Sequence, residues 1–176
     1  MEKIYKISTL CDDEYIEIEE RCFDSLTIIS SRQSDFQYLT KEPAVVETSE
    51  DGGFEYPDYI WYPVPLISER FKRVLDNNGI DNVFYKPVYI EDELLEKRTM
   101  YWLAVFDAIE CLDYEKSLKD EELEWSYEKV VINPLKTGRY KVFKCSEINE
   151  QDIFFKEDIV RELESLDLKG VRFDEI

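Results

Sequence analysis

A helix followed by a strand occurs twice in this chain, and the two copies lie 88 positions apart, from Ser68 to Lys156. In the first copy Ser68 stands where a helix N-cap is expected, and Gly79 stands where the helix should end. The apolar residues within Phe71–Leu75 have the i, i+3, i+4 spacing of a helix face that packs against a core. A strand at Val83–Ile90 is expected after this helix.

The second copy matches the first without a gap, and its helix carries an apolar stripe within Ile159–Leu163. The aligned pairs are Glu69 with Glu157, Arg73 with Arg161, Leu75 with Leu163, Ile80 with Leu168, and Val83 with Val171. A chance match between two ordinary amphipathic units is the alternative. A duplicated unit predicts a pseudo-repeated α+β architecture around one shared core.

The strand patterns predict an α+β fold with a mostly antiparallel sheet, in a single compact domain of residues 1–176. The segment Met100–Leu112 is too apolar for a surface element, so we expect a central strand that continues or bends at Asp107–Asp113. The other expected strands are residues 3–8 at a sheet edge, 83–90, 171–176, and a hairpin of 128–135 with 140–145 around Lys136–Gly138.

Charge excludes several classes of partner. The chain has 41 acidic and 22 basic residues, a net charge of −19, and enough apolar residues (44%) to build a core. A field of this sign repels nucleic-acid phosphates and anionic membrane surfaces, so neither is an expected partner. It speeds the capture of a basic protein, although acidity can also serve solubility alone.

The residues that most enzymes and metal sites use are absent or scattered. There is no histidine, which removes the usual general base and the commonest metal ligand. Gly52–Gly53 lies in an acidic segment that suits a turn rather than a phosphate-binding loop. The four cysteines, at positions 11, 22, 111 and 145, form no CxxC pair, so buried thiols in a reducing cytosol are expected.

These absences predict a binding protein without catalytic residues, metal or cofactor. A carboxylate-dependent enzyme is the alternative, because paired carboxylates alone can perform acid/base chemistry. The first residues are not followed by the apolar stretch of a secretion signal, and no apolar run spans a bilayer, so a cytoplasmic location is expected.

Two acidic stretches, residues 11–24 and 47–58, are the candidate sites for partner binding. The first alternates at Tyr15–Ile18 and is compatible with a strand or a loop. The second mixes carboxylates with aromatic side chains, as an interface with apolar anchors and a charged rim requires. The alternative is that the aromatics are core and the acids solvated. The candidate contact residues are Glu47, Glu50, Asp51, Glu55, Tyr56, Asp58, Tyr59 and Trp61.

Several short motifs occur in the order found in one family. They are Leu66–Phe71, then Asp107–Asp113 with Ser117, then Asp152–Phe154, and finally Leu168–Phe173. Together they resemble the polymorphic-toxin immunity proteins of the "immunity MXAN protein" domain family, formerly a domain of unknown function. The resemblance covers residues 60–176, while the acidic N-terminal third, residues 1–59, matches nothing that can be named from the sequence. The chain departs from the family pattern at Glu110–Cys111 and at Lys156–Asp158.

The resemblance implies a cytosolic antidote that neutralises a secreted toxin, often a nuclease, by protein–protein binding. The acidic composition suits a basic toxin of this kind. The motif residues Ser68, Glu69, Arg70 and Asp113 are expected to hold the fold as cap, ion-pair and turn residues, with the partner bound by the acidic loops. Self-association is left open.

Overall fold

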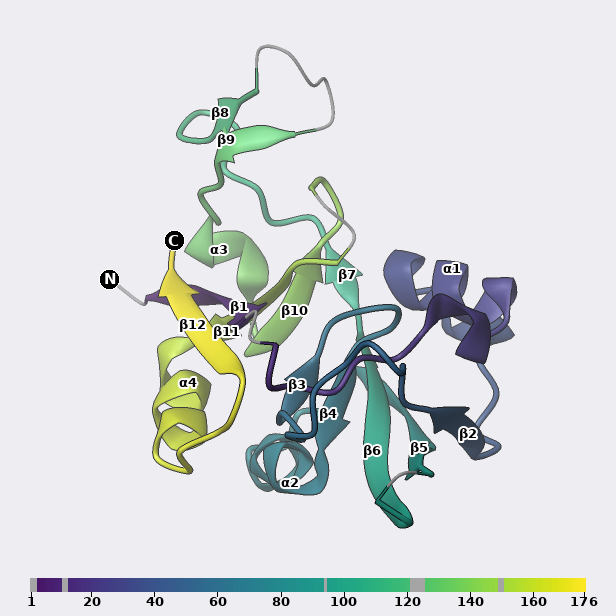
Figure 1. Cartoon of the computed structure of the whole chain (residues 1–176). Helices are drawn as coiled ribbons and strands as arrows, with labels where there is room; N and C mark the ends of the chain where they lie inside the picture. Colours follow the sequence, from purple (N-terminus) through teal and green to yellow (C-terminus); the bar gives the residue numbers. More distant parts are fainter. Residues whose placement is uncertain (1–2, 11–12, 94, 121–125, 149–150) are drawn as a thin grey trace.

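The computed structural model describes residues 3–10, 13–93, 95–120, 126–148 and 151–176, and contains two five-stranded sheets and a small two-stranded ribbon (Figure 1). The sheet that we call the middle sheet has the strand order β2 (Ala44–Glu47), β5 (Val83–Asp92), β6 (Lys97–Phe106), β4 (Leu66–Ser68) and β3 (Tyr59–Ile60). Its neighbouring strands are antiparallel, except that β2 runs parallel to β5.

The second sheet, which we call the terminal sheet, contains both ends of the described chain. Its order is β12 (Val171–Glu175), β1 (Ile4–Thr9), β11 (Ile153–Lys156), β10 (Val142–Cys145) and β7 (Ala108–Ile109). Only the β10–β7 pair is parallel. The ribbon of β8 (Leu118–Lys119) and β9 (Tyr127–Lys129) projects from the body of the molecule (Figure 1). The α+β fold with mostly antiparallel sheets is therefore confirmed.

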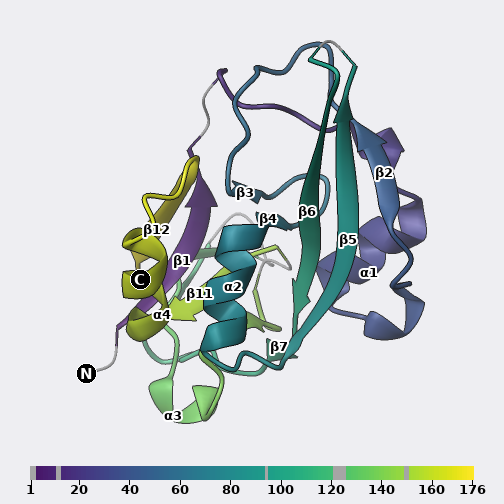
Figure 2. The same ribbon diagram turned by 90° about the horizontal axis from the view of Figure 1, so that it is seen from below.

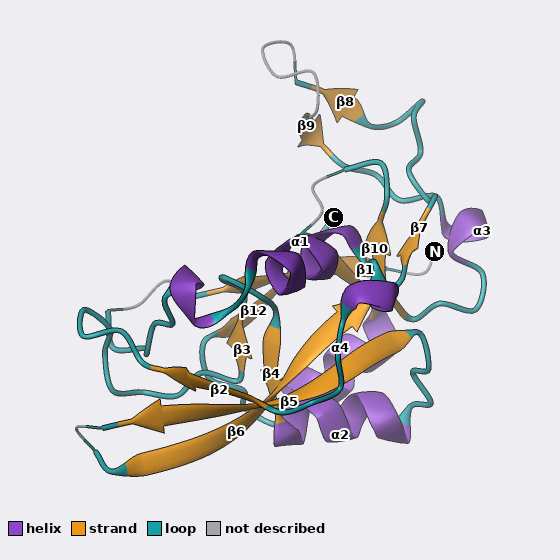
Figure 3. Ribbon diagram, turned by 90° about the vertical axis from the view of Figure 1, so that its right-hand side faces the viewer, coloured by secondary structure: helices purple, strands orange, loops and turns teal. Residues whose placement is uncertain are grey.

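The described residues also form four α-helices and two 3₁₀ turns. They are α1 (Ser25–Gln33), α2 (Glu69–Asn77), α3 (Pro134–Thr137) and α4 (Glu157–Glu164), with η1 (Glu20–Cys22) and η2 (Phe36–Tyr38). Helices α2 and α4 contact each other and lie side by side (Figure 2), whereas α1 lies on the opposite side of the middle sheet from α2 (Figure 3). Among the described residues, no helix has both the length and the apolar character needed to cross a bilayer.

Among the described residues, three clusters of buried apolar side chains form the core. The central cluster lies between the two sheets and includes the inner faces of α2 and α4. A second cluster covers the other face of the middle sheet, beneath α1 and the segment of residues 13–23. A third covers the outer face of the terminal sheet. Both sheets are thus buried on both faces over much of their area.

Strand β6 shows why the segment from Met100 onward has the continuous apolar sequence of a central strand. Ala104 and Phe106 belong to the central cluster, while Leu103 and Val105 belong to the cluster on the opposite face. A strand that is buried on both faces needs apolar residues at every position rather than at alternate ones. The chain then bends at Asp107 and passes into the terminal sheet as β7.

The two helix–strand units that the sequence predicts are present with the expected 88-position shift. Both are strand–helix–strand units: β4–α2–β5 and β11–α4–β12. In each unit the two strands flank one antiparallel strand, which is β6 in the middle sheet and β1 in the terminal sheet. Each helix is also followed by a residue with positive φ, Gly79 (φ 66°) in the first unit and Asp167 (φ 50°) in the second. The shift in sequence is therefore matched by equivalent topology.

Two strand predictions are wrong. Residues 3–8 do form a strand, but β1 lies inside the terminal sheet between β12 and β11, and not at an edge. Its alternation arises because Ile4 faces the third cluster and Ile7 faces the central one. The hairpin around Lys136–Gly138 does not form, because Asn133 caps a short helix with Pro134 in its first turn, and β10 pairs instead with β11 and β7.

Candidate partner-binding groove

A groove of about 510 Å³ opens between the N-terminal acidic segment and the residues around β3. We call it the acidic groove. Its lining residues are Thr9, Leu10, Asp13, Tyr15, Ile16, Glu17, Ile18, Glu19, Ser49, Pro57, Tyr59, Ile60, Trp61, Tyr62 and Gly170. Three carboxylates and four aromatic rings are among them, and neither Lys nor Arg is.

The groove exists because the two acidic stretches lie side by side. Backbone hydrogen bonds join them: the Ile16 N–H donates to the Glu55 carbonyl at 2.9 Å, and the Gly53 N–H donates to the Tyr15 carbonyl at 2.8 Å. The contact is close enough that a Cβ on Gly53 would lie 2.2 Å from the Glu14 carbonyl oxygen, so only glycine fits there. Buried Ile16 and Ile18 fasten the segment to the core. Residues 11 and 12 of the first stretch lie outside the described residues.

Exposed aromatic side chains stand at one wall of the groove. Trp61 is 47% exposed and Tyr62 is 37% exposed, and their ring centroids are 5.4 Å apart. The Tyr62 hydroxyl donates a hydrogen bond to the Glu20 carboxylate, which raises the pKa of Tyr62. On the opposite wall Asp13 and Glu17 are exposed. The groove therefore combines apolar contact area with negative charge.

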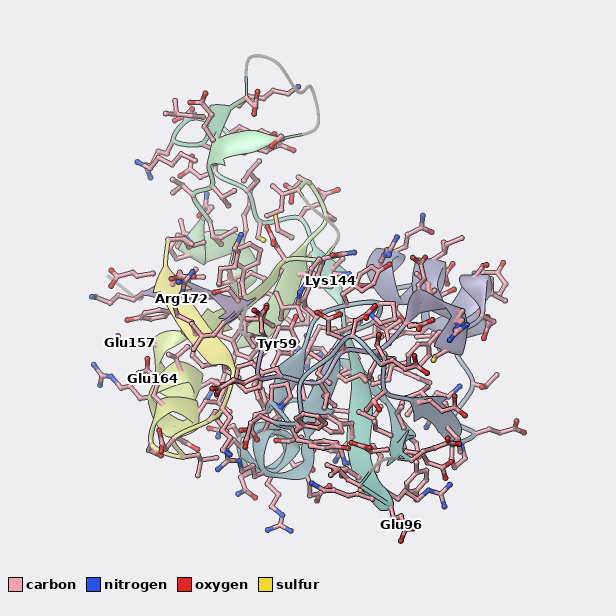
Figure 4. The ribbon with its side chains drawn as sticks, in the orientation of Figure 1. Tyr59, Glu96, Lys144, Glu157, Glu164 and Arg172 are labelled. Carbon is pink, nitrogen blue, oxygen red and sulfur yellow. The ribbon has the colours of Figure 1, made fainter. Side chains whose placement is uncertain are left out.

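The structure separates the eight candidate contact residues into three groups: residues that line the groove, exposed carboxylates outside it, and the more buried Tyr56 and Asp58. Trp61 is exposed in the groove, whereas Tyr59, 4% exposed, belongs to its floor and to the central cluster (Figure 4). Burial, together with the charge of Asp152, raises the pKa of Tyr59. The carboxylates outside the groove lining are exposed at the end of β2 and in the segment that follows it, and are Glu47, Glu50, Asp51 and Glu55.

Tyr56 is half-buried rather than free on a loop. Its hydroxyl donates to Asp92 at 3.3 Å, and the Lys97 ammonium lies 3.9 Å from its ring centroid. Burial and the Asp92 carboxylate raise the pKa of Tyr56 to about 12. These contacts hold Tyr56 in the fold, and its ring also packs against the second apolar cluster.

Asp58 is 4% exposed and joins the two helix–strand units. Its carboxylate accepts hydrogen bonds from the Ser68 hydroxyl (2.5 Å), from the Arg70 guanidinium (2.7 Å to Nε) and from the Lys169 backbone N–H (2.7 Å). Burial raises the pKa of Asp58, but the hydrogen bonds from Arg70, Ser68 and Lys169 outweigh it and hold the pKa below its ordinary value. Asp58 is therefore a structural residue in this fold and is not on the exposed surface.

The motif residues make the contacts expected of structural positions. Ser68 is the N-cap of α2, where its hydroxyl accepts from the Phe71 N–H, and Arg70 also donates to the carbonyls of Leu166 and Asp167. Glu69 accepts from the indole N–H of Trp102 at 2.6 Å. Asp113 precedes a turn and accepts from Lys116 at 2.9 Å.

Two features of the structure were not visible in the sequence. Lys144, on β10, is buried and donates to the Ser31 carbonyl at 3.3 Å, so it ties the C-terminal end of α1 to the terminal sheet (Figure 4). Cys111 and Cys145 are buried and lie beside Glu147, with the three ligand atoms within 4.8 Å of one another. A separation of 34 positions between the cysteines gives no local motif from which this cluster could be found.

Comparison with known proteins agrees with the resemblance read from the motifs. No curated protein matches the chain. The model of the Imm11 immunity protein family matches residues 8–176, and therefore includes most of the acidic N-terminal third that the motifs alone left unmatched. Both walls of the acidic groove lie within the matched residues. The chain belongs to the Imm11 immunity protein family.

Proposed function

We propose that this protein binds a cognate secreted toxin with a basic, nuclease-type domain, and neutralises it by protein–protein interaction through the acidic groove. It would act in the bacterial cytoplasm as part of a polymorphic toxin system. Membership of an immunity protein family supports an inhibitor that works by binding. Nucleic acid and membranes are poor partners for a chain with a net charge of −19.

The composition of the acidic groove is the observation that carries the proposal. Binding hot spots favour aromatic anchors within a polar rim, and Trp61 and Tyr62 offer such anchors beside Asp13 and Glu17. A basic side chain entering the groove would meet carboxylates and aromatic faces, both of which attract cations. The neighbouring carboxylates of residues 47–55 extend the same field and would speed encounter.

A carboxylate-dependent enzyme finds less support. Such catalysis needs two carboxyl groups in one pocket whose pKa values are pushed apart. Burial and the nearby Asp81 raise the pKa of Asp107, but Asp107 does not line the acidic groove. The described carboxylates with lowered pKa values include Asp58 and Asp113, which make structural ion pairs.

Co-expression with the toxin encoded beside this gene tests the proposal. The wild-type protein should protect cells, and Trp61→Ala should weaken toxin binding by about 2 kcal/mol, roughly 30-fold. Replacing Glu17 and Glu19 together by Gln should mainly slow association. Tyr38→Ala is the matched control, because Tyr38 is 50% exposed but does not line the groove.

Binding is to be measured on variants with unchanged melting temperature. If Trp61→Ala and the Glu17/Glu19 double variant bind like the wild type while the wild type protects cells, the toxin is bound elsewhere. Failure of the wild-type protein to bind or protect against the neighbouring toxin would contradict the proposed partner itself.

A further inference from the structure

Cys111, Cys145 and Glu147 converge at one point on the outer face of the terminal sheet. Cys145 ends β10, and Cys111 follows the short strand β7, which pairs with β10 through only two residue pairs. Both cysteines are at most 1% exposed, and Glu147 is half-buried. Their sulfur and carboxylate oxygen atoms all lie within 4.8 Å of one another. A tetrahedral zinc ion, with bonds of about 2.0–2.3 Å, holds neighbouring ligand atoms roughly 3.5–4 Å apart.

The carboxylate is held in place for these sulfur atoms by the backbone. Glu147 accepts hydrogen bonds from the N–H of Cys111 at 3.0 Å and of Leu112 at 3.3 Å, and the Cys145 thiol donates to the same carboxylate at 3.0 Å. Hydrogen bonds of this kind orient ligands around a metal before it binds.

The charge balance suits a divalent cation. Thiols and carboxylates are the ordinary forms of cysteine and glutamate near pH 7, and the hydrogen bond that the Cys145 thiol donates to the Glu147 carboxylate has this geometry. The metal-free form of the site is therefore treated as two thiols and one carboxylate. Binding of M²⁺ would form two metal–sulfur bonds and release two protons, which leaves the net charge at −1 both before and after.

A neighbouring cation accompanies this site. The Lys136 ammonium donates to the Leu112 carbonyl at 3.1 Å, and Leu112 directly follows Cys111 in the chain. A single negative charge on the loaded site would thus have a compensating positive charge close by. Thiolates are soft ligands that select zinc-like metals, whereas Mg²⁺ and Ca²⁺ require oxygen ligands.

We propose that Cys111, Cys145 and Glu147 form a binding site for a thiophilic divalent metal such as Zn²⁺. Three protein ligands leave a fourth tetrahedral position for water. The metal would fasten the segment after β7 to the end of β10, and so stabilise the base of the projecting β8–β9 ribbon.

Cobalt(II) is the probe for the test, because its spectrum reports sulfur ligands directly. The full-length, reduced protein should bind one equivalent of Co²⁺ with a near-ultraviolet sulfur-to-cobalt charge-transfer band, and one equivalent of Zn²⁺ should abolish the band. Cys111→Ser and Cys145→Ser should each lose the band, and Glu147→Gln should bind at least tenfold more weakly. Cys22→Ser is the control, because Cys22 hydrogen-bonds the Glu47 carbonyl near β2, outside the cluster.

A second measurement covers variants that fail to fold. In the wild-type protein, Zn²⁺ should raise the melting temperature. Under partly denaturing conditions that expose the buried thiols, Zn²⁺ should also slow the alkylation of Cys111 and Cys145 but not that of Cys22, as read by mass spectrometry. Absence of the charge-transfer band in the folded wild type, or equal alkylation rates of Cys111 and Cys145 with and without Zn²⁺ under these conditions, would overturn the proposal.

Discussion

At the residue scale, Asp58 connects two distant parts of the fold. It links the start of α2, through Ser68 and Arg70, to the segment between α4 and β12, through the Lys169 N–H. A buried carboxylate with three donors is stabilising only while it is ionised and paired. The same residue that looked like part of a charged rim is therefore a link between the two repeated units.

We expect Asp58→Asn to lower the free energy of unfolding by about 2–3 kcal/mol at pH 7, because hydrogen bonds to a charged group are lost. The folded-state pKa of Asp58 lies below its ordinary value, so its contribution is complete above the unfolded pKa, about 3.9 for Asp. It is lost as the pH falls through the folded pKa. Denaturant unfolding of both proteins from pH 7 down to pH 3 checks this, and a difference that does not shrink at low pH would contradict it.

Ser68 tests whether the motif serves folding or binding. Ser68→Ala removes the N-cap of α2 and one donor to Asp58, and should cost about 1 kcal/mol or slightly more. Toxin affinity should stay unchanged, because Ser68 does not line the acidic groove. Thermal unfolding and binding measurements on the same sample check both expectations. Loss of binding in a fully folded variant would place the motif in the interface.

At the element scale, the two strand–helix–strand units place different residues at the left-handed position that follows the helix. Gly79 has φ 66° and the equivalent Asp167 has φ 50°. The left-handed conformation costs an L-residue roughly 1–2 kcal/mol, whereas glycine adopts it freely. Asp167 is tolerated because Asp is one of the few residues that visits this region.

This equivalence predicts opposite effects at the two positions. Gly79→Ala should destabilise the protein by about 1–2 kcal/mol, although a Cβ there meets no atom within 4 Å, because the cost is conformational. Asp167→Gly should be neutral or stabilise by up to about 1 kcal/mol. Chemical denaturation of the two variants is the measurement. Equal destabilisation by both would show that the Asp167 side chain, and not its backbone, matters at that turn.

At the scale of the whole molecule, the net charge of −19 sets the expected kinetics of binding. The field of a strongly charged protein reaches about 30 Å at 0.01 M salt and about 10 Å at 0.1 M. Association with a basic toxin should therefore slow sharply over this range, while dissociation changes less. Stopped-flow association at several salt concentrations checks this, and an on-rate independent of salt would remove electrostatic steering and leave family membership untouched.

The local features of this fold could be predicted from the sequence because they depend on residues a few positions apart. The cap at Ser68, the stop at Gly79 and the continuous apolar run of β6 each act within one element. The 88-position repeat and the excess of acidic residues are also visible without a structure. These features established the α+β class and pointed to a binding protein with a basic partner.

The tertiary structure alone decided which distant segments meet. The alternating sequence of β1 predicts a strand but does not predict its neighbours. Strand β1 lies between β12 and β11 because this position buries both faces of the terminal sheet. Charge repulsion argues against placing two acidic stretches side by side, yet buried Ile16 and Ile18 and the backbone bonds to residues 53 and 55 outweigh it. The same packing buried Tyr59, which lies in β3, and left Trp61 exposed, because Trp61 lies just beyond the end of that strand and only the fold decides which side chains of the following loop meet solvent.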